Sequence, residues 1–191
     1  MKYVNNLALL LMTVVLAVSC KTQMIDKLDD FNLEQGGYMR TVTPYPVLAA
    51  TFAVSKENMG GTKMEFVAEA VTPNGGANFA SYDLSIRFVD ATPANGTLTT
   101  SIVSLKSIPA SAYTKDPITG YPRATISVTG AEALTATKLT ANDVSIGDRF
   151  EVTATMKLTD GKTFTAANTA ADITGGAFYS SPFFYRINVV K

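Results

Sequence analysis

The sequence of 191 residues contains no histidine, no tryptophan and a single cysteine. Histidine is the usual general base near neutral pH, so its absence excludes Ser-His and Cys-His nucleophilic machinery. Zinc sites built from histidine and cysteine are excluded for the same reason. Without tryptophan the chain lacks the largest flat surface for stacking on a sugar, although tyrosine and phenylalanine also offer apolar faces.

An excess of charge is also lacking, because 16 Lys and Arg residues balance 16 Asp and Glu residues. A nucleic-acid partner requires a basic patch for the phosphates, so nucleic acid is set aside. One cysteine forms no disulfide within the chain, so the fold does not rest on disulfides. The composition is rich in Thr, Ala, Ser and Val, which is typical of β-structure outside the cytoplasm.

The longest apolar run lies near the N-terminus and ends at the cysteine. It reads Leu-Ala-Leu-Leu-Leu-Met-Thr-Val-Val-Leu-Ala-Val-Ser-Cys from Leu7 to Cys20, behind Lys2. A transmembrane helix needs about 20 apolar residues, and this run is shorter. A short apolar core followed by small residues and a cysteine is typical of a bacterial signal peptide whose cysteine is acylated. We therefore predict a lipoprotein signal peptide over residues 1–19 and lipidation of Cys20, the alternative being an ordinary cleaved signal with an incidental cysteine.

Residues 20–35 have mixed charge and no sustained period, which indicates a solvated tether after the lipidated cysteine. Asp26, Asp29 and Asp30 lie close together within it. A second interpretation is that these acidic residues act as a surface-export address.

Alternation of apolar and polar residues is the main structural signal in residues 36–191. A period of two indicates antiparallel strands with one face on a core and one face in water. The clearest runs are Lys63–Thr72, Tyr82–Asp90, Arg123–Thr129, Arg149–Leu158 and Phe183–Val190. In the second run, Leu84, Ile86 and Phe88 are expected on the face that points to the core. Further strands are expected at Tyr38–Val42, Thr51–Ser55, Leu98–Ile108 and Thr163–Ala166.

Turn signals separate these strands. Asp160-Gly161 predicts a tight two-residue hairpin between the strands on either side of it. A single brief helix is expected at Ala131–Lys138. About nine short strands at turn spacings favour an all-β fold, an antiparallel immunoglobulin-like β-sandwich forming one domain over residues 36–191. A closed barrel, or two smaller β-domains dividing near residues 109–122, are the alternatives.

The second half of the chain resembles a family in several short segments. These are Ile108–Tyr113, Gly120–Arg123, Gly147-Asp148, Asp160–Lys162, Asn168 and Ser181–Tyr185. Together with the lipoprotein start, this pattern is similar to small surface lipoproteins of Bacteroidota that accompany outer-membrane importers of the starch-utilisation (Sus) type. The resemblance covers about the last 85 residues, and it implies a β-sandwich, an outer-membrane or cell-surface location and a binding or accessory role beside a SusC/SusD-like importer. It supplies no catalytic residues.

Three tyrosines are the candidate binding residues. Tyr113, Tyr121 and Tyr179 lie in connections that contain proline or glycine, outside the alternating runs. Loops on a rigid sandwich usually carry binding, so these rings are expected to contact a ligand or partner. The alternative is that they pack over the ends of the sandwich.

Asn142, Asp143 and Asp148 offer oxygen ligands for calcium, but their spacing is not that of an EF-hand loop. A polar turn leading into the Arg149 strand is the preferred interpretation, because Asn and Asp often serve turns. No metal and no cofactor is therefore predicted.

With no nucleophile or metal cluster in the sequence, we expect a non-catalytic lipoprotein. Its expected role is as an accessory or glycan- or peptide-binding subunit of a Sus-type uptake system, lipid-anchored in the outer membrane. A structural or adhesive module, in which a sheet edge pairs with a neighbour's strand, is the alternative. A carboxylate-dependent hydrolase is a third possibility, for which the sequence shows no motif.

Lipidation of Cys20 is tested by mass spectrometry of the native polypeptide purified from membranes. We expect a first residue that carries acyl chains, because a lipoprotein signal peptide is removed directly before the acylated cysteine. An unmodified first residue would contradict the prediction.

Overall fold

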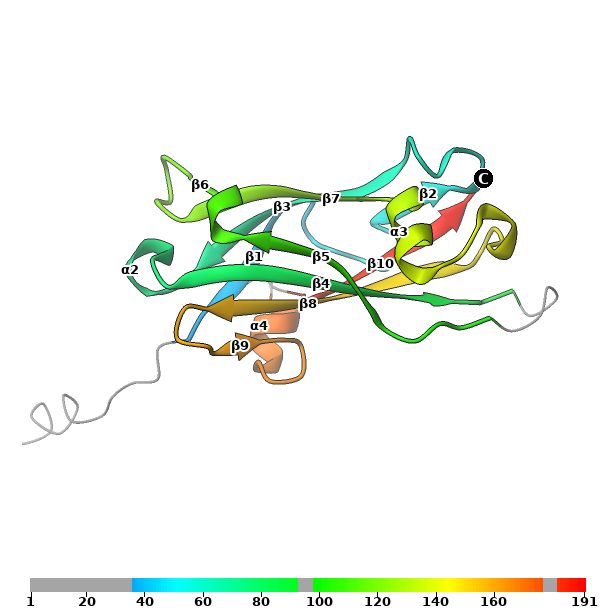
Figure 1. Ribbon diagram of the computed structural model, residues 1–191. Coiled ribbons are helices and arrows are strands. Elements are labelled where there is room, and N and C mark those ends of the chain that lie inside the picture. Colours follow the sequence, from blue (N-terminus) through cyan, green and yellow to red (C-terminus); the bar gives the residue numbers. More distant parts are fainter. Residues whose placement is uncertain (1–35, 93–97, 177–181) are drawn as a thin grey trace, which may run out of the picture. The chain divides into compact units, whose positions relative to one another are not determined.

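The computed structural model describes residues 36–92, 98–176 and 182–191, and these residues form two β-sheets around one core (Figure 1). Sheet A has the strand order β1-β3-β7-β6, and sheet B has the order β2-β10-β8-β4-β5, with β9 paired to β8. The strands of sheet A are β1 (Tyr38–Thr43), β3 (Lys63–Val71), β6 (Thr114–Lys115) and β7 (Pro122–Thr129). The strands of sheet B are β2 (Phe52–Ser55), β4 (Phe79–Val89), β5 (Val103–Pro109), β8 (Arg149–Leu158), β9 (Thr163–Phe164) and β10 (Phe184–Val190). The predicted all-β sandwich is confirmed, with ten strands where about nine were expected.

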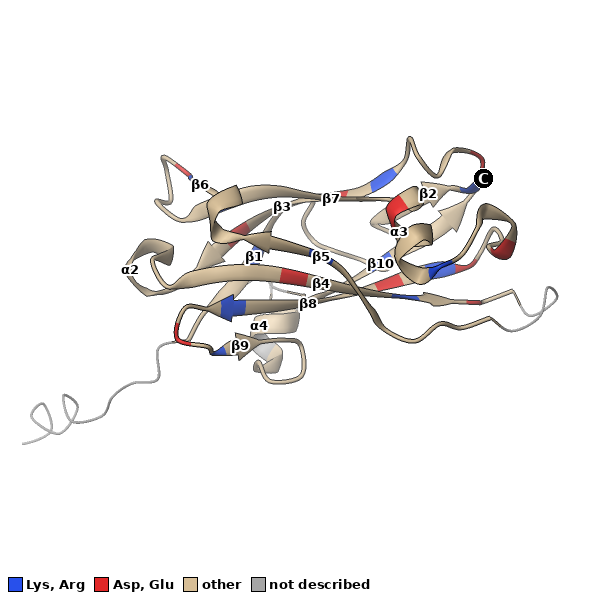
Figure 2. Cartoon of the chain, in the orientation of Figure 1, with Lys and Arg blue, Asp and Glu red and all other residues tan. Residues whose placement is uncertain are grey.

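The predicted inward faces are confirmed by the register of the long strands. Leu84, Ile86 and Phe88 of β4 are buried, and Ile86 and Phe88 lie opposite Val152 and Phe150 of β8. Alternate residues of these strands point out of the sandwich, and both signs of charge occur on the strands of both sheets (Figure 2). Each sheet therefore has one apolar face on the common core.

One pairing differs from the predicted antiparallel arrangement. β2 runs parallel to β10, with Phe52 opposite Ile187 and Val54 opposite Val189. These two strands lie far apart in the sequence, so no hairpin imposes an antiparallel direction on them. The run predicted to start at Leu98 begins its strand only at Val103.

The predicted helix is present as α3 (Gly130–Thr137). Its first turn carries a capping box, in which the Thr129 hydroxyl accepts from the Glu132 amide and the Glu132 carboxylate accepts from the Thr129 amide. The helix ends at Lys138, which has a left-handed backbone conformation. Two further short helices, α2 (Pro73–Gly76) and α4 (Ala171–Gly175), exceed the single helix expected. Both are single turns, too short to leave a helical period in the sequence.

Short 3₁₀ turns complete the described elements. They are η1 (Lys56–Asn58), η2 (Ala110–Ala112) and η3 (Ala141–Asp143).

The Asp160-Gly161 hairpin is present, but its loop is longer than predicted. The Leu158 amide donates to the Lys162 carbonyl over 2.9 Å, which leaves three residues in the loop. Of these, Gly161 alone has a positive φ, 87°. The turn is thus the three-residue kind that ends in a left-handed glycine, and the two-residue turn, which needs two positive φ values, is not formed.

A chain of hydroxyl groups joins the two sheets inside the core. The Tyr185 hydroxyl lies 3.1 Å from the Thr41 hydroxyl of sheet A and 3.1 Å from the Tyr82 hydroxyl of sheet B. The Tyr185 ring also stacks on Phe66, with the ring centroids 4.4 Å apart. Tyr82 and Tyr185 are fully buried, so these hydroxyls obtain in the core the partners that water would otherwise supply.

We predict that the protein loses stability between about pH 10 and 12. Burial raises the pKa of Tyr185 from 10.0 to about 12, and it also raises that of Tyr82. Below pH 10 both states carry neutral tyrosine and the contribution is complete, whereas above pH 10 the unfolded chain ionises first and is favoured. Urea unfolding should show a free energy that falls by about 2 to 3 kcal/mol over this range from Tyr185 alone.

Tyr185→Phe should flatten this alkaline decline while lowering the free energy of unfolding at pH 7 by about 1 kcal/mol, because two hydroxyls lose a partner. Tyr45→Phe is the control, since the Tyr45 ring is exposed. An equally steep decline in Tyr185→Phe would contradict the assignment.

Candidate functional site

A cleft of about 440 Å³ opens where the described chain begins. Its walls come from the start of β1, the end of β3 with α2, the residue before β7, and the segment from β9 to α4. Three aromatic side chains line it, namely Tyr38, Tyr121 and Phe164, and Asn168 adds an amide. An apolar hollow with aromatic walls and a few polar groups is the usual form of a binding site.

Close backbone packing brings these segments together. Gly76 has φ +85°, and a Cβ at this position would lie 2.3 Å from Cδ of Pro122. Glycine at position 76 therefore lets α2 pack against the chain next to Tyr121. A Cβ at Gly37 would lie 2.8 Å from Cγ2 of Thr72, so the chain beside Tyr38 also approaches the end of β3 closely.

A buried carboxylate lies beside the cleft, on the outer face of sheet A. Glu69 of β3 is 0 % exposed, although its neighbours Ala68 and Ala70 are the residues that face the core. In the register of the sheet, Glu69 lies between Arg40 of β1 and Arg123 of β7. Ion pairs of 3.1 Å to Arg40 Nη1 and 2.7 Å to Arg123 Nε compensate the charge of this buried group.

The connection between β6 and β7 closes over this carboxylate. The Thr119 hydroxyl donates to Glu69 Oε2 over 2.6 Å, and Arg123 Nη1 contacts Asp116 Oδ2 at 2.6 Å. The Asp116 carboxylate also accepts from the amides of Thr119 and Ile118, and these bonds, the Thr119 amide foremost, hold its pKa below the ordinary value. The loop is further closed by the Gly120 amide, which donates to the Asp116 carbonyl over 2.8 Å.

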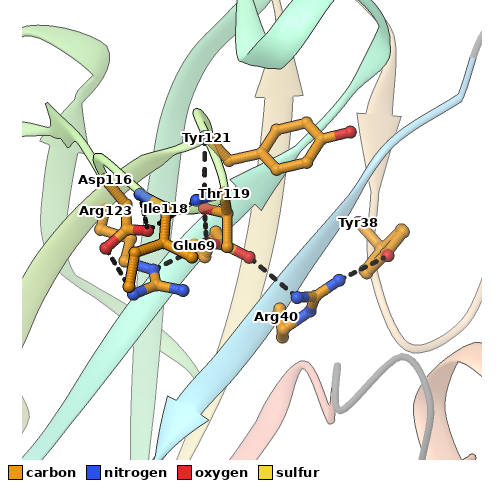
Figure 3. A network of polar contacts seen from close by, with 8 residues as sticks. All are labelled: Tyr38, Arg40, Glu69, Asp116, Ile118, Thr119, Tyr121 and Arg123. Carbon is orange, nitrogen blue, oxygen red and sulfur yellow. Dashed lines mark hydrogen bonds and ion pairs between the residues drawn. The ribbon is translucent and has the colours of Figure 1, made fainter.

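The same network reaches the two tyrosines of the cleft (Figure 3). Arg40, which binds Glu69, also donates from Nη2 to the Tyr38 hydroxyl over 3.3 Å. The Tyr121 amide donates to the Thr119 hydroxyl over 3.4 Å, directly beyond the closed loop. Glu69 is thus linked through Arg40 to one aromatic wall and through Thr119 to another.

The structure separates the three tyrosines predicted to bind. Tyr121 lines the cleft. Tyr113 is 9 % exposed, and its ring meets Phe79 edge to face with centroids 4.8 Å apart, so it packs in the core and does not line the cleft. Tyr179 and the lipidation residue Cys20 lie outside the described residues.

The oxygen groups considered for calcium serve the local backbone. Burial alone would raise the pKa of Asp148, but donors from Ser145, Ala91 and Thr92 hold it below the ordinary value. Asp143 accepts from the amide and hydroxyl of Thr140, as a cap of η3. Within residues 36–92, 98–176 and 182–191, no group of three or more Asp, Glu, His or Cys is placed to hold a metal ion.

Sequence reasoning missed Tyr38 and Phe164 as members of the cleft. Both lie in predicted strands, where an aromatic residue is ordinarily a core residue. Asn168 had no predicted role in a site, although the structure places it in the wall of the cleft.

No family model matches the chain, and a search of curated proteins gives no significant match. In the part of the chain that the structure describes, no helix is long and apolar enough to cross a membrane.

We predict that Glu69→Gln lowers the free energy of unfolding by about 3 kcal/mol, because Arg40 then has no carboxylate partner and Arg123 keeps only Asp116. Glu65→Gln is the matched control, on the same strand and the same outward face, where an exposed pair with Lys63 contributes less than about 1 kcal/mol. Urea titration of both variants measures the difference. Equal effects would show that the buried carboxylate does not hold this face together.

Proposed function

We propose that this protein is a non-catalytic lipoprotein of a bacterial outer membrane that binds a glycan or peptide segment in the cleft beside Tyr38 and Tyr121. The observation that carries the proposal is the aromatic cleft, whose tyrosines contact a charged network centred on Glu69. The Tyr38 ring, held through its hydroxyl by Arg40, loses little conformational entropy when a ligand binds. This favours recognition by stacking over chemistry on the ligand.

The chemistry of the walls selects the class of ligand. Tyr38, Tyr121 and Phe164 offer apolar faces to a sugar ring or to an apolar side chain, and Asn168 offers an amide donor and acceptor. The cleft is not enclosed, so it has room for one segment of a longer chain. An accessory subunit that presents nutrient to a SusC/SusD-like importer requires such an open site.

In this proposal the location of the protein rests on the lipoprotein signal that ends at Cys20. Acylation at this residue anchors the body to the outer membrane, and three acyl chains exceed the two membrane signals that stable anchoring requires. Residues 20–35 then form the tether to the body.

A second candidate function rests on the edge of sheet A. Within the described ranges β1 pairs with one strand, β3, and is thus an edge strand of sheet A, the position at which a sheet can add a strand from another protein. This supports a structural or adhesive module. Two observations together would favour this function over ligand binding. The full chain would self-associate as its concentration rises, and it would not be retained on ligand arrays.

Retention of the purified full chain on glycan and peptide arrays tests ligand binding. We expect Tyr38→Ala, Tyr121→Ala and Phe164→Ala each to weaken retention about fivefold, since a stacked ring contributes on the order of 1 kcal/mol. Tyr121→Phe should keep most of the retention, because the ring remains.

Ile118→Ala is the control, because this side chain is 91 % exposed in the loop next to Tyr121 and does not line the cleft. If all three alanine variants are retained like the parent protein, the cleft is not the binding site.

A further inference from the structure

The outer face of sheet B carries a row of charged residues, like the row of Arg40, Glu69 and Arg123 on sheet A. In the row on sheet B the positive charges outnumber the negative ones. Arg87 of β4, Glu151 of β8 and Arg186 of β10 lie opposite one another in the register. Arg149, two residues before Glu151 on β8, points to the same face and binds it as well. Three arginines therefore lie around one glutamate in the register of sheet B, and two of them bind its carboxylate.

Both oxygens of Glu151 are taken by two of the three arginines. Oε2 accepts from Arg87 Nε at 2.8 Å and Nη2 at 2.5 Å, and Oε1 accepts from Arg149 Nε at 2.9 Å. Burial alone would raise the pKa of Glu151, but these bonds from Arg149 and Arg87 hold it below the ordinary value. Both oxygens of Glu151 are thus engaged by Arg87 and Arg149, and Glu151 makes no ion pair with Arg186.

Arg186 is the arginine left over. Its Nε is buried and has no hydrogen-bond partner, and the described residues offer its guanidinium no ion pair. A buried charged donor without an acceptor is costly in a folded protein. Arg186 as a whole is half-buried, so its Nη groups, which are not among the buried unpartnered atoms, are the ones that the acceptor of a ligand can reach.

A small pocket next to Arg186 shows where such a ligand fits. It has a volume of about 140 Å³, and its other walls are Val47, Leu48, Ala49 and Phe184. Leu48 is 63 % exposed and Phe184 is 38 % exposed, so both present apolar surface to the solvent.

The lip of this pocket is held in place. The Asn188 side chain donates to the Ala49 carbonyl over 2.8 Å, and the Leu48 amide donates to the Thr51 hydroxyl over 2.6 Å. The hollow is therefore formed before a ligand binds.

We propose that Arg186 and this apolar lip form a binding site for a carboxylate attached to an aliphatic group, such as the C-terminus of a peptide that ends in leucine. A guanidinium binds a carboxylate through two parallel hydrogen bonds, and Val47, Leu48 and Phe184 cover the aliphatic group. None of these residues lines the cleft beside Tyr121, so this site is independent of the function proposed above.

The test is binding of a fluorescein-labelled pentapeptide ending in leucine to the full chain, followed by fluorescence anisotropy. We expect the free-acid peptide to bind at least about tenfold more tightly than the same peptide with a C-terminal amide, because a charged acceptor faces a charged donor. Arg186→Gln should abolish this difference, and Arg186→Lys should keep a part of it. Equal binding of acid and amide peptides would overturn the proposal.

Lys157→Gln is the matched control, since it removes one positive charge from the same outer face of sheet B. It should leave the tenfold difference unchanged, and a loss equal to that in Arg186→Gln would overturn the site by showing a general charge effect. Leu48→Ser should weaken a leucine-ending peptide more than a glycine-ending one. Inorganic phosphate and N-acetyl-leucine are compared as competitors of the peptide on the parent protein. Equal displacement by the two would also overturn the proposal, because it would show an anion site without an apolar subsite.

The thermal midpoint of Arg186→Gln provides a readout that separates binding from a structural role. Since the described residues give the guanidinium no ion pair and its Nε no hydrogen-bond partner, its removal should leave the midpoint unchanged or higher. A markedly lower midpoint would show that Arg186 is a structural residue, and would contradict the proposal.

Discussion

A carboxylate buried on the outer face of a sheet must be neutralised, and this constraint organises the region around the cleft. Glu69 is fully buried, and the side chains that cover it are Arg40, Arg123 and Thr119. Desolvating an ionised group without partners is prohibitive, so the strands on both sides and the loop above must keep their positions together. The closed loop ends at Gly120 and Tyr121, and Tyr121 forms one wall of the cleft, so the position of this wall depends on the loop.

The two outer faces use the same arrangement with different charge balance. Sheet A has the row Arg40–Glu69–Arg123, and Asp116 adds a second acid, so two cations face two anions. Sheet B has the row Arg87–Glu151–Arg186, and Arg149 adds a third cation against one anion. The balanced row fastens a loop and is consistent with a structural role, whereas the unbalanced row retains a guanidinium for an external anion.

Local pattern predicted the fold better than it predicted the sites. Alternation placed Leu84, Ile86 and Phe88 inward because one face of each long strand is buried, and the register confirms it. The position of the Asp160-Gly161 turn could also be predicted from local sequence. The length of its loop could not, because the three-residue loop needs a positive φ only at Gly161. Strand order and the parallel pairing of β2 with β10 depend on contacts across the chain, which no local pattern carries.

The sites could not be predicted because they form from register and from distant segments. Nothing in the sequence near Glu69 distinguishes it from the exposed Glu65, which lies on the same strand and points to the same face. The loop that covers Glu69 lies about fifty residues later in the sequence. Tyr113 and Tyr121 occupy similar proline-containing connections, yet one packs on Phe79 and the other lines the cleft.

Hydrogen–deuterium exchange of Glu69→Gln most directly tests the central claim, that the buried carboxylate holds the Tyr121 wall of the cleft. The account predicts that the amides of Asp116 and Gly120 lose protection while that of Ile126 in β7 keeps it; unchanged protection at Asp116 and Gly120 would contradict it.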